Sequence, residues 1–265
     1  MHNIHDKTTR HSSQTKTEEK KKMYFGDIEY SVDMQDNVFQ AYDESKIPKR
    51  TINFEHFIKL PLYRQGYDFT CGVACVMSIL RYAGYEFDTR EDRLLWKLGS
   101  TPAEGTNCKM IEQFLNSVGK EYDSNVCETF LGAALDLDTN YDADTHDEKI
   151  KDLMCNLRKH IDLRQPVICV IQAWREDGKY CGENEDGHYV ILVGYEEVKT
   201  DEYVYYFMDP STSYSYTYLP EKDFVDRWHD EYVDENGIKE SLRISIVIHY
   251  KKQWLEREDV AFFLG

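Results

Sequence analysis

The chain has 265 residues, of which 41% are hydrophobic and 14% aromatic, so it is long enough to bury a sizeable core. Its formal net charge is −17, which repels phosphate backbones, and we therefore expect no nucleic-acid partner. Such a surface favours basic substrates at low ionic strength, although acidity also serves solubility alone. The sequence has no run of about 20 apolar residues, so we expect no transmembrane helix and no membrane partner.

The N-terminal segment and the cysteines narrow the class of protein further. Residues 1–22 are polar and charged, which predicts a disordered tail, and residues 23–265 are expected to form a single domain. The tail lacks the apolar core of a signal peptide, so we expect a cytoplasmic location. The seven cysteines are odd in number and form no pair of CxxC motifs, which argues against a disulfide scaffold and a structural zinc site.

Helices are predicted in the first half of the chain. Residues 71–83 are apolar on nearly every face, which indicates a buried helix. A second helix is expected to run from a Thr89 cap to Leu98, and a third from a Thr106 cap to Gly119. A glycine follows each of the first two helices as a stop signal.

The second half of the chain has the character of strands. Residues 136–149 are acidic and poorly patterned, which indicates a loop, and a helix is expected to follow as far as Ile161. Short apolar runs predict strands at residues 166–173, 189–195, 203–208 and 244–249, with a short helix opened by Pro220. Helices that precede strands along the chain favour an α+β fold.

A cysteine at the start of the first predicted helix is the candidate nucleophile. The positive end of the helix macrodipole favours the thiolate of Cys71, which is the nucleophilic form. The helix end contributes only about 0.3–1 kcal/mol, so a histidine partner is also needed. Gln65, six residues earlier, and the backbone N–H of Cys71 are placed to bind a developing oxyanion. Gly72, directly after the nucleophile, is expected to contact the substrate.

His188 is the candidate base, because it stands at the entrance of an apolar predicted strand. Gly187 precedes it and lets a substrate approach closely. In that place His188 would take the thiol proton and later protonate the leaving group. If residues 189–195 and 203–208 pair as a hairpin, Asp209 lies beside His188 and orients its ring. Thiol, imidazole and carboxylate together form a predicted catalytic triad.

Each of these features also has an ordinary structural explanation. A cysteine in an apolar helix is usually a small core residue, a histidine before a strand is often a hydrogen-bonded structural group, and Asp-Pro commonly forms a turn. Their occurrence in this order, with a glutamine ahead of the cysteine, favours the catalytic interpretation.

These residues resemble those of the bacteriocin-processing, double-glycine leader peptidases and their stand-alone relatives in the papain-like clan. The resemblance runs from about Leu60 to Trp228 and includes residues 65–72, 187–190 and 209–210. It implies an α+β papain-like fold, in which an N-terminal helical half carries the nucleophile and packs on a C-terminal antiparallel β-sheet that carries the histidine and the aspartate.

The resemblance also implies a role for each candidate residue. Carried over position by position, the roles are the oxyanion residue for Gln65, the nucleophile for Cys71, the base for His188 and the third triad member for Asp209. The chain departs from the family pattern on either side of the nucleophile. Thr70 and Val73 stand where the family commonly has an acidic residue and a proline.

Two possible metal sites are weakly supported. The acidic residues at 136–144 alternate as calcium ligands do, but Tyr141 replaces the glycine of the sharp turn and Asp147 replaces the closing glutamate. A cluster of His146, Cys155 and His160 has no metal-ligand spacing. We therefore expect no metal.

Two further residues offer alternatives within the site. Cys75 lies one helical turn after Cys71, where it either resolves an oxidised nucleophile or, more commonly for such a residue, packs in the core. His229 follows Trp228 in a predicted surface helix and is an alternative base, although exposed helical histidines are usually inert.

We therefore expect a thiol hydrolase that needs no cofactor and cleaves a peptide or isopeptide bond of a peptide or protein substrate through a thioester acyl-enzyme. The same thiolate also suits acyl transfer to an amine, as in the similar phytochelatin synthases, or deamidation of a glutamine side chain. A further alternative is a catalytically silent pseudo-peptidase that binds peptides, which a thiol pKa of about 8.5 at Cys71 would favour.

Overall fold

The structure, a computed structural model, describes residues 22–25, 28–33, 38–41, 54–85, 90–122, 131–138, 146–173, 187–211, 216–233, 237 and 239–250. The helices are η1 (Phe54–His56), α1 (Cys71–Tyr82), α2 (Glu91–Leu98), α3 (Cys108–Tyr122), α4 (His146–Asp162) and α5 (Glu221–Arg227). The predicted tail at residues 1–22 lies outside the described residues except for Lys22, and the single domain at 23–265 stays a prediction.

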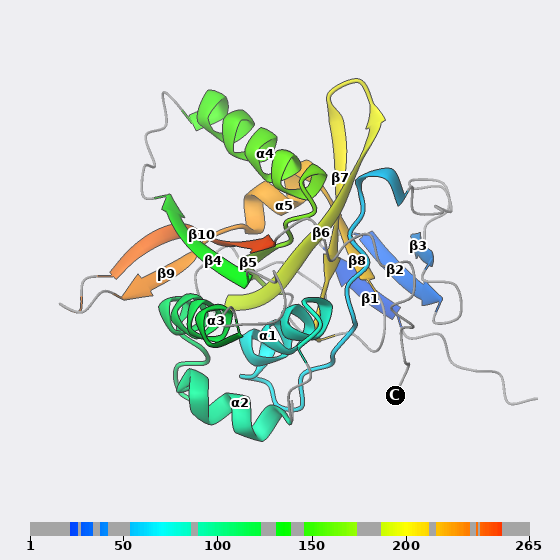
Figure 1. Ribbon diagram of the computed structural model, residues 1–265. Coiled ribbons are helices and arrows are strands. Elements are labelled where there is room, and N and C mark those ends of the chain that lie inside the picture. Colours follow the sequence, from blue (N-terminus) through cyan, green and yellow to red (C-terminus); the bar gives the residue numbers. More distant parts are fainter. Residues whose placement is uncertain are drawn as a thin grey trace, which may run out of the picture.

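An antiparallel β-sheet forms the centre of the fold (Figure 1). The strands are β1 (Lys22–Phe25), β2 (Ile28–Asp33), β3 (Val38–Ala41), β4 (Leu131–Asp138), β5 (Val167–Gln172), β6 (Gly187–Lys199), β7 (Glu202–Met208), β8 (Tyr216–Pro220), β9 (Asp230–Val233) and β10 (Lys239–Tyr250). The central sheet has the order β4-β10-β5-β6-β7-β8, and β9 pairs with the first part of β10. Strands β1, β2 and β3 form a separate antiparallel sheet.

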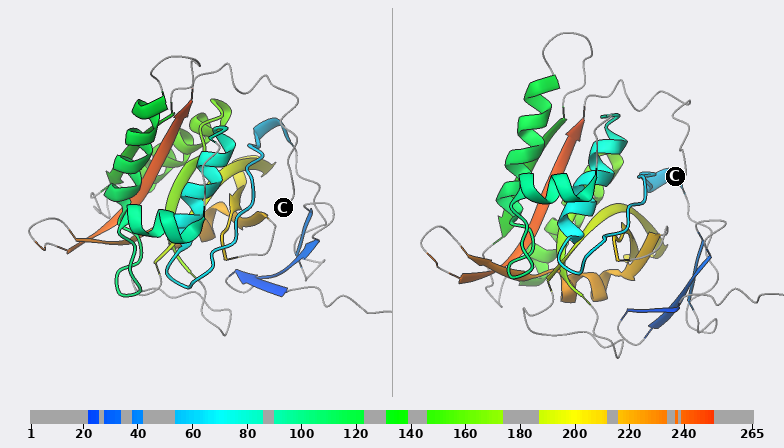
Figure 2. Two further views of the ribbon diagram at one scale, coloured as in Figure 1. Left: turned by 60° about the horizontal axis from the view of Figure 1, so that its bottom comes forward. Right: turned by 90° about the horizontal axis from the view of Figure 1, so that it is seen from below.

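Helices cover the central sheet on both faces. In Figure 1, α1, α2 and α3 lie below the sheet and α4 and α5 above it. α1 packs on β6, and Figure 2 shows these two elements side by side in two further views. On the opposite face, the ring of Phe224 in α5 meets Tyr205 and Phe207 of β7 at centroid distances of 5.4 and 4.9 Å. The predicted α+β class is therefore confirmed, with the helix of Cys71 packed on the sheet of His188.

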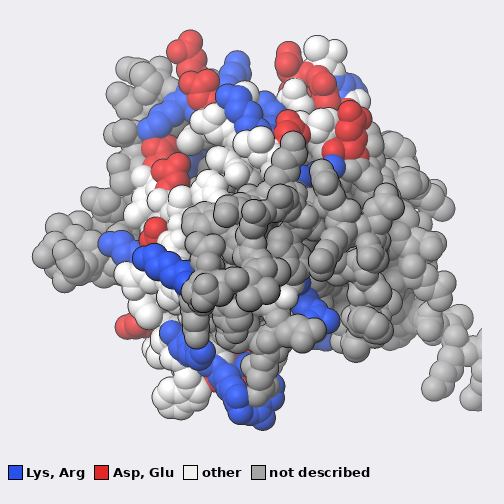
Figure 3. Space-filling view, viewed as in Figure 1, with Lys and Arg blue, Asp and Glu red and all other residues white. Residues whose placement is uncertain are grey.

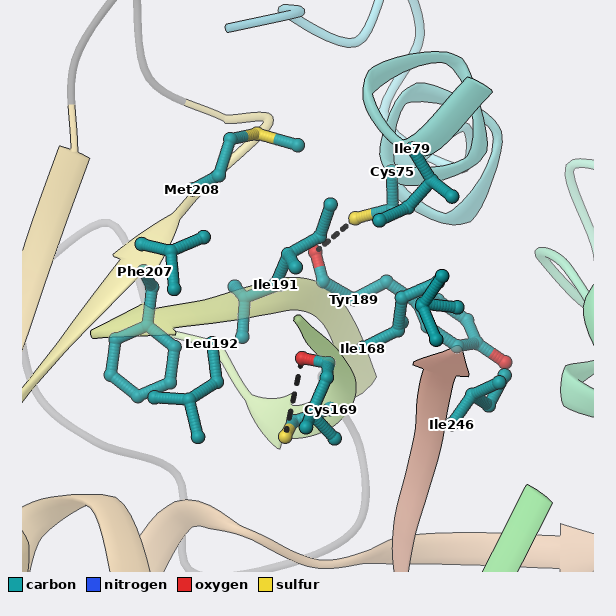
Figure 4. Packing of buried hydrophobic residues seen from close by; sticks show 14 of the residues in the cluster. Cys75, Ile79, Ile168, Cys169, Tyr189, Ile191, Leu192, Phe207, Met208 and Ile246 are labelled. Atoms are coloured by element: carbon teal, nitrogen blue, oxygen red, sulfur yellow. Dashed lines mark hydrogen bonds between the residues drawn. The ribbon is translucent and has the colours of Figure 1, made fainter. Parts of the chain in front are cut away.

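The core between α1 and the sheet explains why α1 has no polar face. Figure 4 shows Cys75 and Ile79 of α1 over Tyr189 of β6, whereas Leu192 and Phe207 lie farther from the helix. Every residue of α1 from Cys71 to Leu80 is buried. Because each large apolar side chain contributes about 1.5–3 kcal/mol when buried, packing rather than capping holds this helix. Thr70, at the cap position, makes no capping hydrogen bond.

The predicted strands are all present, and two of them are longer than expected. β6 extends beyond residues 189–195, where residues 196–199 continue the strand with less burial, and β10 extends beyond 244–249. β5 lies within the predicted run of 166–173 and is buried along its whole length. A strand covered on both faces reads as a continuous apolar run, as this one does.

The prediction that residues 136–149 form a loop is wrong at both ends. Residues 136–138 complete β4 and residues 146–149 begin α4, while 139–145 lie outside the described residues. The last four residues of β4 alternate leucine with aspartate, which is the pattern of a strand with one covered and one open face. Its final residue, Asp138, pairs with Lys149 of α4 at an Oδ1–Nζ distance of 2.6 Å.

The predicted N-terminal caps of α2 and α3 also differ from the structure. Asn107, not Thr106, precedes α3, and its side-chain oxygen accepts a hydrogen bond from the N–H of Lys109 at 2.9 Å. Thr106 is buried, with its hydroxyl 2.7 Å from that of Ser100. Arg90 occupies the cap position of α2, and Thr89 lies outside the described residues.

Gly119 does not end α3, which continues to Tyr122. A Cβ atom at residue 119 would clash with the carbonyl oxygen of Leu131 on β4. The glycine therefore allows helix and strand to approach closely, and it is not a stop signal. Asn116 fixes the same contact, because its side chain donates to the carbonyl of Ala133 and accepts from its N–H, both at 2.9 Å.

Charge is unevenly spread over the face drawn in Figure 3. Basic side chains gather toward the bottom, over α2, and acidic ones at the upper right, at the tip of the β6–β7 hairpin. The exposed charged residues include Arg93, Lys97 and one acid, Asp92, on α2, and Glu197, Asp201, Glu202 and one base, Lys199, on the hairpin. The net charge therefore does not by itself describe the surface that a substrate meets. Within the described residues, no helix combines the length and apolar character needed to cross a bilayer.

We expect Gly119→Ala to lower the free energy of unfolding by about 1–3 kcal/mol, because the added methyl group must push α3 and β4 apart. Urea denaturation followed by circular dichroism measures this. Lys120→Ala, an exposed change in the same helix, is the control and should stay within about 0.5 kcal/mol of the wild type. Equal stability of both variants would contradict the close-approach role of Gly119.

Candidate active site

Cys71 is the first residue of α1, and its thiol lies against the ring of His188. Burial raises the pKa of the Cys71 thiol, but a hydrogen bond with His188, the positive charge of that ring, and the backbone N–H groups of Tyr189 and Gly72 lower it. The net result is a lowered pKa. The surroundings of the sulfur therefore favour the thiolate, the nucleophilic form of the group.

His188 at the start of β6 and Asp209 just after β7 form the second contact of the site. The Nε2 atom of His188 lies 2.9 Å from Oδ1 of Asp209, and both side chains are buried. The predicted hairpin is confirmed, since β6 and β7 pair antiparallel with Ile191 opposite Met208. Because Nε2 faces the carboxylate, Nδ1 is the ring nitrogen left for the thiol.

The thiol of Cys71 and the imidazole of His188 share one proton, and Asp209 lies next to the imidazole. Burial lowers the pKa of His188, but the negative charges of Asp209 and Cys71 and their hydrogen bonds raise it well above its ordinary value. A lowered thiol pKa and a raised imidazole pKa describe the same ion pair, in which the proton moves from the sulfur to the histidine. Ser211 holds Asp209 in place by donating to Oδ1 from its N–H at 2.9 Å and its hydroxyl at 2.8 Å.

Gln65 lies in the loop that leads into α1, and its backbone ties that loop to the site. Its N–H donates to the carbonyl of Pro210, next to Asp209, at 2.9 Å. Its carboxamide nitrogen donates to the carbonyls of Tyr67 at 3.0 Å and Asp68 at 3.2 Å. The carboxamide N–H groups of Gln65 thus already donate within the loop. To donate to a substrate oxyanion, the carboxamide must break its longer hydrogen bond, the one to Asp68.

The two glycines expected to contact the substrate have different surroundings. Gly72 is buried, and a Cβ atom there would lie 2.9 Å from Cβ of Thr106 and 3.2 Å from the ring of Tyr189. Packing alone therefore accounts for the missing side chain at residue 72. Gly187 is exposed, and a Cβ atom there would clash with the carboxylate of Asp230. Contact of either glycine with a substrate stays a prediction.

Asp230 is a largely buried acid near the site that no sequence pattern indicates. It begins β9, and its Oδ1 accepts from the N–H of Glu231 at 2.8 Å and from the carboxamide of Gln172 at 3.4 Å. Burial raises the pKa of Asp230 to about 6, outweighing these hydrogen bonds. Its position beside Gly187 follows from the pairing of β9 with β10 and of β5 with β6, which local sequence does not reveal.

The structure describes the surroundings of the other residues that the sequence offered, Cys75, His229 and His160. Cys75 is buried, its thiol lies 3.6 Å from the carbonyl oxygen of Tyr189, and burial raises the pKa of Cys75 well above its ordinary value. It therefore packs as a core thiol. Burial lowers the pKa of His229, which lies between α5 and β9, and its carbonyl accepts a hydrogen bond from the carboxamide of Gln172 at 2.8 Å. His160, proposed for a metal cluster, has Nδ1 2.9 Å from Oε1 of Gln165.

Comparison with known proteins gives a family and two similar folds. Residues 57–232 match the model of the Peptidase_C39 like family. One similar structure is a double glycine motif protease from an AMS/PCAT transporter in complex with the leader peptide, at 16% identity and a TM-score of 0.43, covering 74% of this chain and 94% of that one. Another is the peptidase domain of Streptococcus ComA, a bifunctional ABC transporter in a quorum sensing pathway, at 15% identity and a TM-score of 0.44, covering 72% and 98%. A search of curated proteins found no match.

We expect iodoacetamide to alkylate Cys71 even below the ordinary thiol pKa, because the thiolate persists there. His188→Ala removes the hydrogen bond and the positive charge and leaves burial, which raises the pKa. The alkylation rate at neutral pH should then fall about tenfold or more and recover only as the pH rises. Peptide mapping by mass spectrometry across the pH range measures the rate, with the half-buried Cys155 of α4 as internal reference. Identical pH profiles for wild type and variant would refute the pairing.

Proposed function

The chain belongs to the Peptidase_C39 like family, and from that membership we propose that it is a cysteine peptidase that cleaves a peptide or isopeptide bond by way of a thioester. The observation that carries the proposal is the buried series of contacts from Cys71 through His188 to Asp209. Thiol, imidazole and carboxylate stand in the order that a nucleophile, its base and the group that orients the base require.

In the first half of the reaction, the thiolate of Cys71 attacks the carbonyl carbon of the scissile bond. The carbonyl electrons move to the oxygen, which becomes an oxyanion in a tetrahedral intermediate. When these electrons return, the carbon–nitrogen bond breaks, and His188 gives its proton to the departing amine. The acyl group is then held on Cys71 as a thioester.

In the second half, water replaces the amine. His188, now neutral, takes a proton from the water while the oxygen of that water attacks the thioester carbon. The carbon–sulfur bond breaks, the carboxylic acid leaves, and the thiolate and the protonated imidazole are restored. Asp209 keeps Nε2 protonated throughout and stabilises the positive charge of the ring.

Stabilisation of the oxyanion is assigned to the backbone N–H of Cys71 and the carboxamide of Gln65. Two facts support this for Gln65. Its loop runs directly into Cys71, and its own N–H is bound to Pro210 beside the triad carboxylate. One donor of this kind is typically worth about 100- to 1000-fold in rate. The substrate class that we propose is a peptide or protein, and a cytoplasmic location stays a prediction from the N-terminal sequence.

We expect Cys71→Ala to abolish hydrolysis of a fluorogenic peptide library. Asp209→Asn keeps the shape of the side chain but removes the charge that raises the pKa of His188, and should reduce kcat about 100- to 10,000-fold. Asp201→Asn, the same change in the exposed turn between β6 and β7, is the matched control and should leave kcat unchanged. Full activity of Cys71→Ala would mean that the triad is not the site of reaction.

Acyl transfer and deamidation use the same triad, and the products separate them from hydrolysis. We expect a glutamyl-cysteinyl peptide incubated in water enriched with oxygen-18 to give a shorter product that carries one labelled oxygen at its new carboxylate, because water accepts the acyl group. Mass spectrometry detects this. A product lengthened by a second peptide would indicate transfer, and conversion of the side-chain amide of a glutamine-containing peptide to a carboxylate, with the backbone intact, would indicate deamidation.

A further inference from the structure

We propose that Glu91 is a positioning residue of the active site, which holds the loop that carries Gln65 in the conformation needed for oxyanion stabilisation. This loop, residues 65–70, is called the oxyanion loop below. The inference rests on the proposed function and extends it to a residue of α2 that takes no part in the chemistry.

The carboxylate of Glu91 contacts the oxyanion loop at both ends. The N–H of Gly66 donates to Oε1 at 2.8 Å and to Oε2 at 3.1 Å. The hydroxyl of Thr70, the residue before the nucleophile, contacts Oε1 and shares its one hydrogen between this oxygen and the carbonyl of Tyr67. Hydrogen bonds to an ionised acceptor are about twice as strong as those between neutral groups. One side chain thus pins the start and the end of the loop to α2.

Hydrogen bonds inside the loop connect this contact to the carboxamide of Gln65. The hydroxyl oxygen of Thr70 accepts from the N–H of Tyr67 at 3.1 Å, and the N–H of Thr70 donates to the carbonyl of Tyr67, also at 3.1 Å. That same carbonyl accepts from Nε2 of Gln65 at 3.0 Å. The position of the carboxamide is therefore set in steps from Glu91 through Thr70 and Tyr67.

Packing does little to hold the middle of the oxyanion loop. The side chain of Tyr67 is 59% exposed, and Asp68 and Gly66 are exposed as well. The start of the loop is bound to Pro210 and its end continues into the buried helix α1. Between these two fixed points, the contact with Glu91 provides the order that a buried side chain would otherwise provide.

Glycine at residue 66 is required for this contact. A Cβ atom there would clash with Oε2 of Glu91, and the far end of a flexible side chain would be the part to move. Gly66→Ala therefore displaces the carboxylate without any change at residue 91. The same contact can be broken from either side, which gives two independent tests of one role.

The test compares two reactions of Cys71. Acylation by p-nitrophenyl acetate passes through an oxyanion, whereas alkylation by iodoacetamide does not. We expect Glu91→Ala and Gly66→Ala each to reduce the acylation rate about tenfold or more, while the alkylation rate stays within about twofold of the wild type. Glu91→Gln keeps an oxygen that accepts from Gly66 or Thr70, and should restore most of the acylation rate.

Asp92→Ala, the neighbouring exposed acid on α2, should change neither rate. If Glu91→Ala acylates at the wild-type rate while Cys71→Ala does not react, the role of Glu91 is refuted and the proposed function stands. If both rates fall together in both variants, Glu91 is only structural. If Cys71→Ala acylates at the wild-type rate, the proposed function fails, and the role of Glu91 with it.

Discussion

The packing of α1 on β6 is the constraint on which the site depends. It brings the first residue of an apolar helix to the second residue of an apolar strand, and so sets the sulfur of Cys71 against His188. It also removes water from both groups, which makes an unpaired charge on either one very costly. The ionisation of the thiol and that of the imidazole are therefore coupled, and the charge of Asp209 favours the protonated imidazole. The interaction that stabilises the charges is also the one that favours the thiolate form of Cys71.

A buried network of this kind serves only if its members are fixed. Asp209 is held by Ser211 and by its place after β7, and His188 by its place in the register of β6 and β7. Cys71 stands on a helix whose residues are buried from Cys71 to Leu80. The oxyanion loop is the part of the site with exposed residues. There the carboxylate of Glu91, rather than buried packing, holds the backbone in place. Rigid elements carry the reacting groups, and polar contacts hold the loop that assists them.

The surroundings of Thr70 account for one departure from the resemblance to the double-glycine leader peptidases. That family commonly has an acidic residue directly before the cysteine, and this chain has threonine there. In the structure the hydroxyl of Thr70 binds the carboxylate of Glu91, so a negative charge still lies next to this position, supplied by another helix. The same contact explains why Gly66 has no side chain and why Thr70 does not cap α1. A substitution in one element is thus matched by a residue 21 positions away.

The sequence by itself determined the triad candidates and the α+β class. Cys71 opens an apolar run, and Asp209 and His188 sit at the ends of two runs that a short turn folds into a hairpin, so local pattern was enough to place them. Only the tertiary structure decided the contacts of Gly119, Glu91 and Asp230. Each is defined by a contact with a segment remote in the chain: the backbone of β4, the oxyanion loop and the start of β6. Helix and strand periodicity report which face of an element is buried, but they carry no information on which remote segment covers it.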